Sequence, residues 1–542
     1  MFMSMPTARF PSQPAEHVSR ELAEILAIYE RLYPARHLNF YLYEGDNPVW
    51  CEPTIIEGEF VPGPEHLSPE YLGHLACPGK DDAAPPVTIM LSVPRAPDPR
   101  EASQTEPDWK PVRLLRMIYF LNPLIYEQIR HMAEMMRKWR RDRGRDMVAL
   151  ARGHGTPLMT GPGPQANGRP AILIGMHWLE LGGAENLAFD CIGWALEAGL
   201  RVFVIAAVPS LQRLAGRLPQ DADIRFIRLD RYLPHHLWPR FVERLVQGEN
   251  IRLVHIHHCA PLYRALPYLR ARAPWVRVID STHIVEYADG GYPRISGTWS
   301  NFIDTHHVIS NDLIRFYQDR FHAAGKLALG RMLDRSQLAQ PLVPMTMRAG
   351  KKSLHFAFVG RFYYQKRPIV LIAILRALMR WARRGGVELR ATVMGEGPFR
   401  AAMCRLLRRY GLAERVEIRS ARMPVFELLE EADILLLPSS NEGLALVCYE
   451  AVRHGCIPIS TRVGAQDELL PEGLLLPLSP FATVRAAVRL VDRLWRDGDF
   501  LARQVAELNA AWTRLGDDPT AREVLMPVYL SAASTGQERR RA

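Results

Sequence analysis

The sequence lacks the features that mark several classes of protein. Its 542 residues contain no run of about eighteen apolar residues, so we predict no membrane-spanning helix. The start, MFMSMPTARFPSQPAEHV, does not join a basic stretch to an apolar core, so we predict no secretory signal. The seven cysteines are dispersed without a C-x-x-C pair, which argues against a disulfide framework or a cysteine zinc site and is typical of a reduced cytoplasmic protein.

What is present is the composition of a folded, basic protein. Hydrophobic residues make up 48% of the chain and charged residues 23%, which excludes wholesale disorder. The formal net charge of +10 suits nucleic acid, an anionic membrane surface or phosphorylated small molecules, and no zinc-finger or RNA-binding pattern favours the first. The sharpest basic cluster surrounds Trp139 at residues 137–145, where a solvated helix end and a membrane or polyanion contact are both open interpretations.

The chain changes texture near residue 171. Before it, a helical segment (19–33), two strand candidates (38–43 and 87–93) and a long helical pattern (112–150) lead into the Gly- and Pro-rich GHGTPLMTGPGPQANGRP, which is typical of a linker. After it, apolar strands alternate with amphipathic helices, first from AILIGM to VRVIDSTHI and again from LHFAFVG to CIPISTRVG. That rhythm predicts two doubly wound α/β units with parallel sheets, which bind ligands between the carboxyl ends of their strands.

Polar residues gather where the predicted strands of the second α/β unit end. Glu442 follows the strand ADILLLPSS, and Glu450 lies eight residues later in the next helix. Gly443 and Leu444 would open that helix, whose positive end can hold an anion through backbone N–H groups. Two glutamates near a helix start are also explained by capping.

Two further loops fit phosphate chemistry. In GRFYYQKRP, Arg361 offers a bidentate fork and Lys366 a point charge for two adjacent phosphates, although such a loop can equally be plain surface. Gly395, in MGEGP, would let the backbone approach a ligand closely. In the first α/β unit, Gly182 and Gly183 resemble a shortened phosphate-cradling turn, or simply a tight turn.

Taken together, GRFYYQKRP, MGEGP, PSSNEGLALVCYEA and HGCIPISTRVGAQDEL resemble the family-4-type retaining glycosyltransferases of the GT-B fold, over about residues 171–515. The resemblance implies that Arg361 and Lys366 grip the diphosphate of a nucleotide sugar, and that Glu450 binds the ribose. It implies a contact of Glu442 with the donor sugar, and closure of Gly182 and Gly183 on the phosphates from the facing domain. It also implies that His283 approaches the transferred sugar, which makes Glu442 and His283 the candidate catalytic residues.

The resemblance divides the chain into five segments. We expect an accessory α+β module of unknown role, a linker, a Rossmann-like acceptor domain, a Rossmann-like nucleotide-sugar donor domain, and a C-terminal helix with a basic tail; their bounds are 1–150, 151–170, 171–345, 346–515 and 516–542.

Some residues depart from the family pattern. Relatives commonly have glycine where this chain has Arg367 and Ala465, and LALGRMLDRSQL lacks the usual Asn-Gly turn at the domain junction. The histidines of HIHH (255–258) invite a metal interpretation, but adjacent strand residues point to opposite faces, so we expect no metal site. Asp221-Ala222-Asp223, a metal-binding pattern in another glycosyltransferase fold, is most simply a polar turn.

The expected function is therefore transfer of a hexose-type sugar from a nucleotide-diphosphate sugar to a glycan or lipid-linked glycan, as in polysaccharide biosynthesis, with retention. Fixed cations would replace a metal, so no cofactor is expected. We expect no nucleic-acid partner. An anionic membrane surface is expected as a further partner. The expected location is the cytoplasm, extending to the inner face of the membrane. The alternatives are a non-catalytic GT-B scaffold or regulatory protein and a nucleotide-sugar epimerase.

Overall fold

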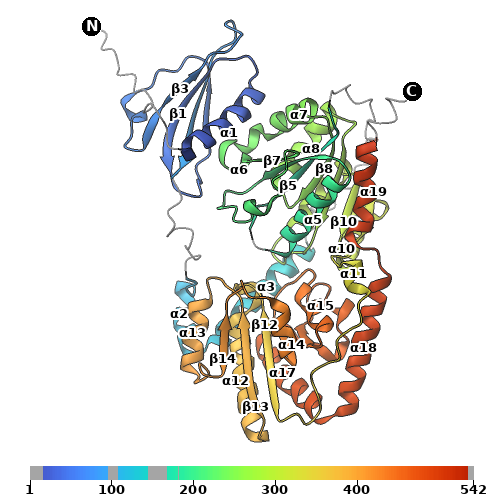
Figure 1. The fold of residues 1–542 in the computed structure, drawn as a ribbon. Coiled ribbons are helices and arrows are strands. Elements are labelled where there is room, and N and C mark those ends of the chain that lie inside the picture. Colours follow the sequence, from blue (N-terminus) through green and yellow to red (C-terminus); the bar gives the residue numbers. More distant parts are fainter. Residues whose placement is uncertain (1–15, 96–107, 144–167, 181, 535–542) are drawn as a thin grey trace.

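The computed structural model of the chain describes residues 16–95, 108–143, 168–180 and 182–534, and these residues form three sheets (Figure 1). The strand orders are β2-β4-β1-β3, β11-β10-β9-β8-β5-β6-β7 and β14-β13-β12-β15-β16-β17. The first sheet is mixed, whereas every paired strand of the other two is parallel. The predicted fold class, two Rossmann-like domains of GT-B type behind an N-terminal α+β region, is confirmed.

The N-terminal module packs one helix on a four-stranded sheet. Leu38, Phe40 and Leu42 alternate along β1 and bury their side chains, which is the pattern of a strand with one face on a core. The module leans on the next domain, where the Tyr29 hydroxyl donates to the Tyr232 carbonyl at 2.9 Å. Its elements are α1 (Glu16–Leu32), β1 (Leu38–Gly45), β2 (Thr54–Glu57), β3 (Tyr71–Cys77) and β4 (Val87–Pro94).

The second domain, here the N-terminal Rossmann domain, is a seven-stranded parallel sheet covered by helices on both faces (Figure 1). Its central strands are buried along their whole length, as expected for a parallel sheet. The strands are β5 (Ala171–Met176), β6 (Arg201–Ala206), β7 (Ile224–Ile227), β8 (Ile251–His257), β9 (Arg277–Thr282), β10 (Thr305–Val308) and β11 (Leu327–Leu329). The helices are α5 (Gly183–Glu197), α6 (Leu229–Tyr232), α7 (Trp238–Gly248), α8 (Ala260–Arg272), α9 (Gly291–Thr298), α10 (Asn311–Phe321) and α11 (Arg335–Leu338).

The third, the C-terminal Rossmann domain, repeats this plan with six strands. They are β12 (Ser353–Val359), β13 (Glu388–Met394), β14 (Val416–Arg419), β15 (Ile434–Leu437), β16 (Ile457–Thr461) and β17 (Leu475–Leu476). The helices are α12 (Pro368–Gly385), α13 (Arg400–Arg409), α14 (Val425–Glu431), α15 (Leu446–Arg453), α16 (Gln466–Leu469), α17 (Pro480–Arg496) and α18 (Gly498–Asp517).

The two Rossmann domains are joined at a junction on one side of the molecule. After α18 the chain returns to the N-terminal Rossmann domain, where α19 (Ala521–Ser534) packs on α5 and buries Tyr529 (Figure 1). Arg331, almost fully buried, ties the junction together because its guanidinium forms ion pairs with Glu468 and Asp518 and donates to the Ile309 carbonyl.

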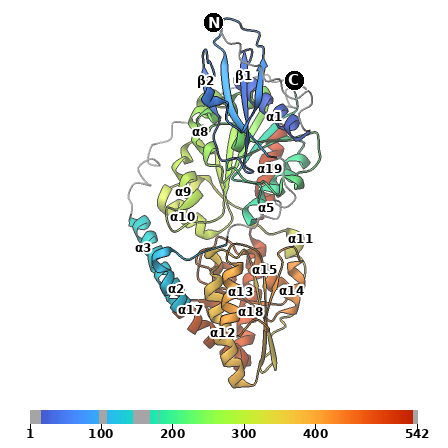
Figure 2. The same cartoon turned by 90° about the vertical axis from the view of Figure 1, so that its left-hand side faces the viewer.

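Residues 108–143 lie apart from the N-terminal module with which the sequence analysis grouped them. They form α2 (Arg116–Leu121) and α3 (Pro123–Arg143); α3 packs against α12 and α17 of the C-terminal Rossmann domain, and α2 packs on α3 (Figure 2). The physical reason is a buried seam of Tyr119 and Tyr126, which joins the core of that domain. The long predicted helix breaks between Leu121 and Pro123, and its last residues, like most of the predicted linker, lie outside the described residues. In the described part of the chain, no helix is long and apolar enough to cross a membrane.

Candidate functional site

The loops that follow β12 and β15 bring two predicted site residues into contact. The Lys366 ammonium donates to Glu442 Oε1 at 2.6 Å, and the Glu442 carboxylate is almost fully buried. The loops are also joined through their backbones, since Ser440 N–H donates to the Gln365 carbonyl at 2.7 Å and the Gln365 amide donates to the Asn441 carbonyl at 2.7 Å. The pair is a preformed positive group beside a buried acceptor, held at the carboxyl edge of the sheet.

A close contact within the protein itself requires glycine at residue 395. With φ at +153°, its absent Cβ would lie 2.0 Å from the Gly360 carbonyl oxygen. The glycine therefore lets the loop after β13 pack directly on the loop that carries Arg361 and Lys366. This packing supports the backbone of the Arg361 loop.

The two domains touch at Gly443. A Cβ on this residue would lie 1.8 Å from the His283 carbonyl oxygen, so only glycine fits this approach of one domain to the other. The neighbouring Asn441 amide donates to the Val285 carbonyl at 3.0 Å, and Leu444 packs against the cores of both domains. Glu442 is consequently held beside the strand-end loop that carries His283.

The helix after this loop begins later than the sequence suggested. Its first residue is Leu446, so Gly443 and Leu444 belong to the preceding loop. Gly183 faces this helix start from the other domain, since its missing Cβ would lie 4.0 Å from Leu446 Cδ1. Glu450 lies on α15 with an exposed side chain, and the described residues give it no ion pair with Arg361 or Lys366.

Glu185 is a site residue that the sequence analysis did not single out. It lies in the first turn of α5, its Oε2 fills the place where a Cβ on Gly182 would stand, and its Oε1 accepts from the Trp178 indole at 2.9 Å. Burial raises the pKa of Glu185, and the charge of Arg361 in the facing domain partly offsets this rise. Arg361 itself is exposed and thus free to turn toward a ligand.

Uncharged histidines occupy the facing edge of the N-terminal Rossmann domain. His257 and His283 are buried there and His258 is half-buried; both ring nitrogens of His257 and His283, and Nε2 of His258, lack a hydrogen-bond partner among the described residues. Burial lowers the pKa of His258 to about 3 and that of His283 well below its usual range, so both are neutral at pH 7. The His258 ring stacks on Tyr292 at 4.4 Å and meets His283 edge-on at 5.0 Å. Buried polar atoms without partners point to groups that a ligand can satisfy.

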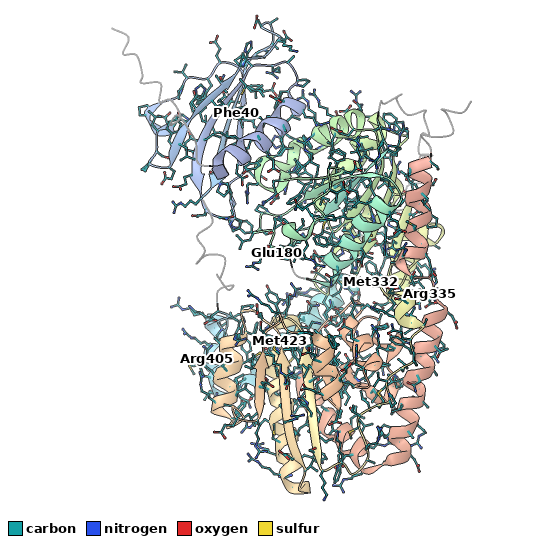
Figure 3. The ribbon with its side chains drawn as sticks, viewed as in Figure 1. Phe40, Glu180, Met332, Arg335, Arg405 and Met423 are labelled. Carbon is teal, nitrogen blue, oxygen red and sulfur yellow. The ribbon has the colours of Figure 1, made fainter. Side chains whose placement is uncertain are left out.

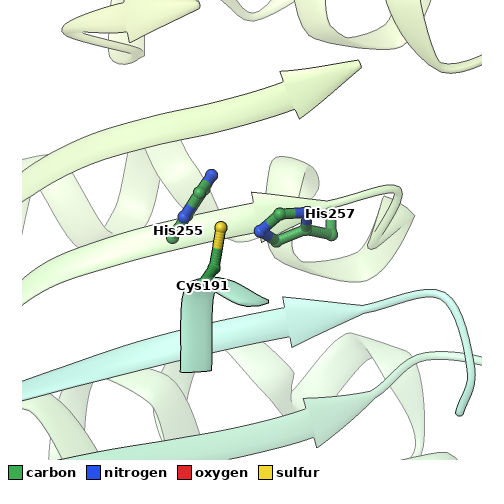
Figure 4. A group of neighbouring side chains, drawn as sticks. All are labelled: Cys191, His255 and His257. Carbon is green, nitrogen blue, oxygen red and sulfur yellow. The ribbon is translucent and has the colours of Figure 1, made fainter. Parts of the chain in front are cut away.

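A second, fully buried group of potential metal ligands shares His257 with the first. Cys191, His255 and His257 place ligand atoms within 4.8 Å of one another (Figure 4). However, His255 Nδ1 already pairs with the Tyr529 hydroxyl at 2.7 Å and its Nε2 with Ser281 Oγ at 2.8 Å. Ser281 in turn bonds His307 Nδ1 at 2.8 Å, so His255 anchors the returning helix α19 to the sheet. The Cys191 thiol also interacts with the Tyr529 hydroxyl, so among these three described residues only the His257 ring lacks a hydrogen-bond partner. This bonding argues against a metal site here.

Arg367, the departure from glycine noted in the sequence, contacts the extra helix α3. Its backbone is left-handed at φ +50°, the conformation that favours glycine. The buried guanidinium contacts His131 Nδ1 on α3 at 3.1 Å and donates to the Leu478 carbonyl at 2.5 Å. Burial next to Arg367 lowers the pKa of His131 to about 4, so His131 is neutral and its ring nitrogen accepts. The arginine thus fastens α3 to the loop that carries Lys366.

Asp221 and Asp223, by contrast, cap a turn remote from this interface. Asp223 N–H donates to Asp221 Oδ1 at 2.9 Å, and the Asp223 carboxylate pairs with Arg169.

The facing edges therefore carry complementary chemistry. One offers fixed or mobile cations and a buried carboxylate, which suits an anionic group with adjacent hydroxyls. The other offers neutral ring nitrogens, which can hydrogen-bond an uncharged polyol without adding charge. Figure 3 labels Glu180 and Met423 on the two opposed edges.

Comparison with known proteins agrees with the resemblance. Residues 353–493 match the family model of the group 1 glycosyl transferases. The phosphatidylinositol N-acetylglucosaminyltransferase gpi3 subunit of Schizosaccharomyces pombe is 24% identical over 54% of this chain and 65% of its own length. The D-inositol 3-phosphate glycosyltransferase of Corynebacterium diphtheriae is 27% identical over 51% of this chain and 68% of its own length. The chain thus spans about two thirds of these relatives. A sucrose-phosphate synthase from Thermosynechococcus elongatus superposes with a TM-score of 0.49 at 20% identity, over 69% of this chain and 99% of that structure.

Proposed function

We propose that this chain, whose residues 353–493 match the family model of the group 1 glycosyl transferases, moves a sugar from a nucleotide-diphosphate sugar to an acceptor. The observation that carries the proposal is the Lys366–Glu442 pair at 2.6 Å, held at the interface of two Rossmann domains. A lysine held there can meet a diphosphate, and its carboxylate partner can accept from a sugar hydroxyl.

In the proposed donor complex, Arg361 and Lys366 bind the diphosphate and Glu450 binds the ribose hydroxyls. The start of α15 adds backbone N–H groups on the donor side, and Gly182 and Gly183 close on the phosphates from the facing loop. The exposed Arg361 side chain supports this assignment, because it can exchange its interaction with Glu185 for one with phosphate.

The chemical step is glycosyl transfer through an oxocarbenium-like state. Positive charge grows on the sugar while negative charge grows on the leaving phosphate, and Arg361 and Lys366 stabilise the latter. The neutral His283 adds no positive charge near the developing cation and offers a ring nitrogen to a sugar hydroxyl. We propose same-face attack with retention and without a metal, since the fixed cations serve the leaving group.

For the donor sugar we propose a hexose or N-acetylhexosamine, and for the acceptor a glycan or lipid-linked glycan. The first relative is named for acting on phosphatidylinositol, and the second for acting on an inositol phosphate, both of which carry a polyol and a phosphate. The cytoplasmic location, reaching the inner face of a membrane, stays a prediction.

Calorimetric titration with UDP, GDP and ADP, in the presence of a metal chelator, tests the donor site. We expect one nucleotide to bind to the wild type and to lose at least about tenfold in affinity in Arg361→Ala. Arg390→Ala removes an exposed arginine near the opposite end of the same sheet and is the matched control. Absence of binding by all three nucleotides would favour a non-catalytic scaffold instead.

Retention and transfer are tested on the product. With the donor base known, the anomeric configuration of the product is read by NMR against that of the donor sugar. An inverted product contradicts same-face attack. A rearranged donor formed without any acceptor indicates an epimerase.

A further inference from the structure

The outer side of α2 and α3 exposes an unusual number of large apolar side chains. Leu114, Met117 and Leu121 are 88%, 75% and 75% exposed. Along α3, the inward positions are buried, whereas the outward positions form an exposed stripe at helical spacing; its members are Ile125, Met132, Met136 and Trp139. Soluble proteins rarely expose such a continuous apolar surface without a binding role.

The charged side chains of residues 110–143 that are exposed and unpaired all have one sign. Six exposed cationic side chains flank this apolar surface, and none forms an ion pair within the described part of the chain; they are Lys110, Arg113, Arg116, Arg137, Arg140 and Arg143. The acids of α3 are unavailable to them, because Glu127 and Glu134 turn inward and Asp142 pairs with Arg141 and Arg320.

Helix α13 extends the same corner. Arg409 donates to the Phe120 and Leu121 carbonyls at 2.7 and 3.3 Å, which fixes α13 beside α2, and α13 also exposes Arg405 and Arg408 (Figure 3). We name the outer side of residues 110–143 together with Arg405, Arg408 and Arg409 the α2–α3 face.

We propose that the α2–α3 face docks on the surface of an anionic lipid bilayer. Methionine, leucine and tryptophan side chains can enter the boundary between headgroups and acyl chains, while the surrounding arginines meet lipid phosphates. A second copy of this chain is a poor occupant, since a symmetric contact would bring like charges together. Nucleic acid would satisfy the arginines but leave the apolar stripe in water.

The inner side of α3 links this surface to the site. His131 contacts Arg367, Arg141 donates to the Glu286 carbonyl at 2.5 Å in the other Rossmann domain, and Lys138 lies over the Tyr287 ring at 5.3 Å. A docked α3 would therefore hold the domain interface at a fixed distance from the bilayer. That positional benefit rests on the proposed function with a lipid-linked acceptor, whereas docking itself does not.

Vesicle flotation of the full chain tests docking without any assay of activity. We expect the wild type to float with phosphatidylcholine–phosphatidylglycerol vesicles and to stay behind with phosphatidylcholine alone. Arg137→Glu, Arg140→Glu and Arg143→Glu together should lower the partition coefficient at least about tenfold, and raised salt should weaken wild-type binding. The matched control is Arg380→Glu, Arg383→Glu and Arg384→Glu, an equal change of charge on the exposed carboxyl end of α12.

A second variant tests the apolar part. Met132→Ser with Met136→Ser keeps all charges and should also weaken flotation, at an unchanged thermal unfolding temperature. Failure of the wild type to float, or equal losses in the α12 control, would overturn the proposal. So would a wild-type dimer in light scattering that the methionine variant converts to a monomer. Nucleotide affinity, measured on the same samples, separates a failed docking surface from a failed donor site.

Discussion

The two Rossmann domains share one topology, but where they face each other one presents charged side chains and the other uncharged ones. The carboxyl edge of the C-terminal domain carries Arg361 and the Lys366–Glu442 ion pair. The corresponding edge of the N-terminal domain carries His258 and His283, whose burial keeps them neutral. One parallel sheet can thus serve an anionic leaving group and another an uncharged sugar, because the loops differ and the scaffold does not.

The largest effect is expected from removing the charge of Lys366. Lys366→Met keeps the aliphatic part of the side chain but leaves the buried Glu442 carboxylate without a cation. It also removes a cation that would bind the diphosphate of the donor. We expect kcat/KM for donor turnover to fall by about 10³-fold, on the scale of losing a group that stabilises developing charge. Lys352→Met, an exposed lysine just before β12, is the control. Similar losses in both variants would show that the charged edge has no special role.

The second prediction breaks the contact between the two edges. Gly443→Ala places a Cβ where the His283 carbonyl oxygen now stands, so backbone must shift. A shift near 1 Å in a catalytic arrangement costs about 10²-fold, and we expect a loss of that size in kcat with the nucleotide affinity largely kept. Gly193→Ala, a helical glycine with open space around it, should behave as the wild type. A fully active Gly443→Ala enzyme would mean that the domains work at a wider separation.

A third prediction tests whether His283 acts as a neutral hydrogen-bonding group. His283→Gln keeps a neutral hydrogen-bonding group of similar size, whereas His283→Phe removes the hydrogen bond. We expect kcat to fall about tenfold in the phenylalanine variant and clearly less in the glutamine variant, the scale of one hydrogen bond. Since the pKa of His283 is far below 7, replacing it should leave the pH profile above pH 6 unchanged; a lost limb in that range would contradict a neutral His283.

The smallest effect concerns the free energy of unfolding as a function of pH. The pKa of His258 is about 3 in the folded chain and 6.5 in the unfolded chain, so only the unfolded chain gains a proton as pH falls from 6.5. The free energy of unfolding is therefore unaffected by His258 above pH 6.5. Below that pH the protonation of His258 in the unfolded chain lowers it by about 1.4 kcal/mol per pH unit. Urea unfolding of the wild type and His258→Gln at pH 7.5, 6 and 5 should show a shallower decrease in the variant. Parallel curves would show that His258 is protonated in the folded state.

Much of the fold follows from local patterns. Continuous apolar runs such as ILLL at β15 predict buried parallel strands because such a strand has both faces covered. Two elements escape that argument for stated reasons. β10 has the sequence THHV, and its buried histidines are accommodated because Asp280, Ser281 and Gly330 form hydrogen bonds with their ring nitrogens. The attachment of α3 to a domain that begins more than two hundred residues later depends on a long-range match that no local periodicity encodes.

The site shows the same division. The spacing of Lys366 and Glu442 relative to their strands predicts that they lie at one edge of the sheet, and they meet there. The roles of Gly395 and Gly443 could not be foreseen, because each glycine is explained by a backbone atom that approaches from another loop. Glu185 could have been found, since an acid in the first turn of a helix after a glycine pair faces the same interface.

The position of α2 and α3 in the chain has a consequence for biosynthesis. A ribosome that makes about 5–20 residues per second releases these helices well before α12 and α17, the helices on which α3 packs. Tyr119 and Tyr126, which are buried in the folded protein, then stay uncovered for roughly 20–70 s of synthesis, the time needed for about 370 residues. During that interval the nascent chain exposes more apolar surface than the folded protein does, and such surface favours aggregation until the C-terminal Rossmann domain is made.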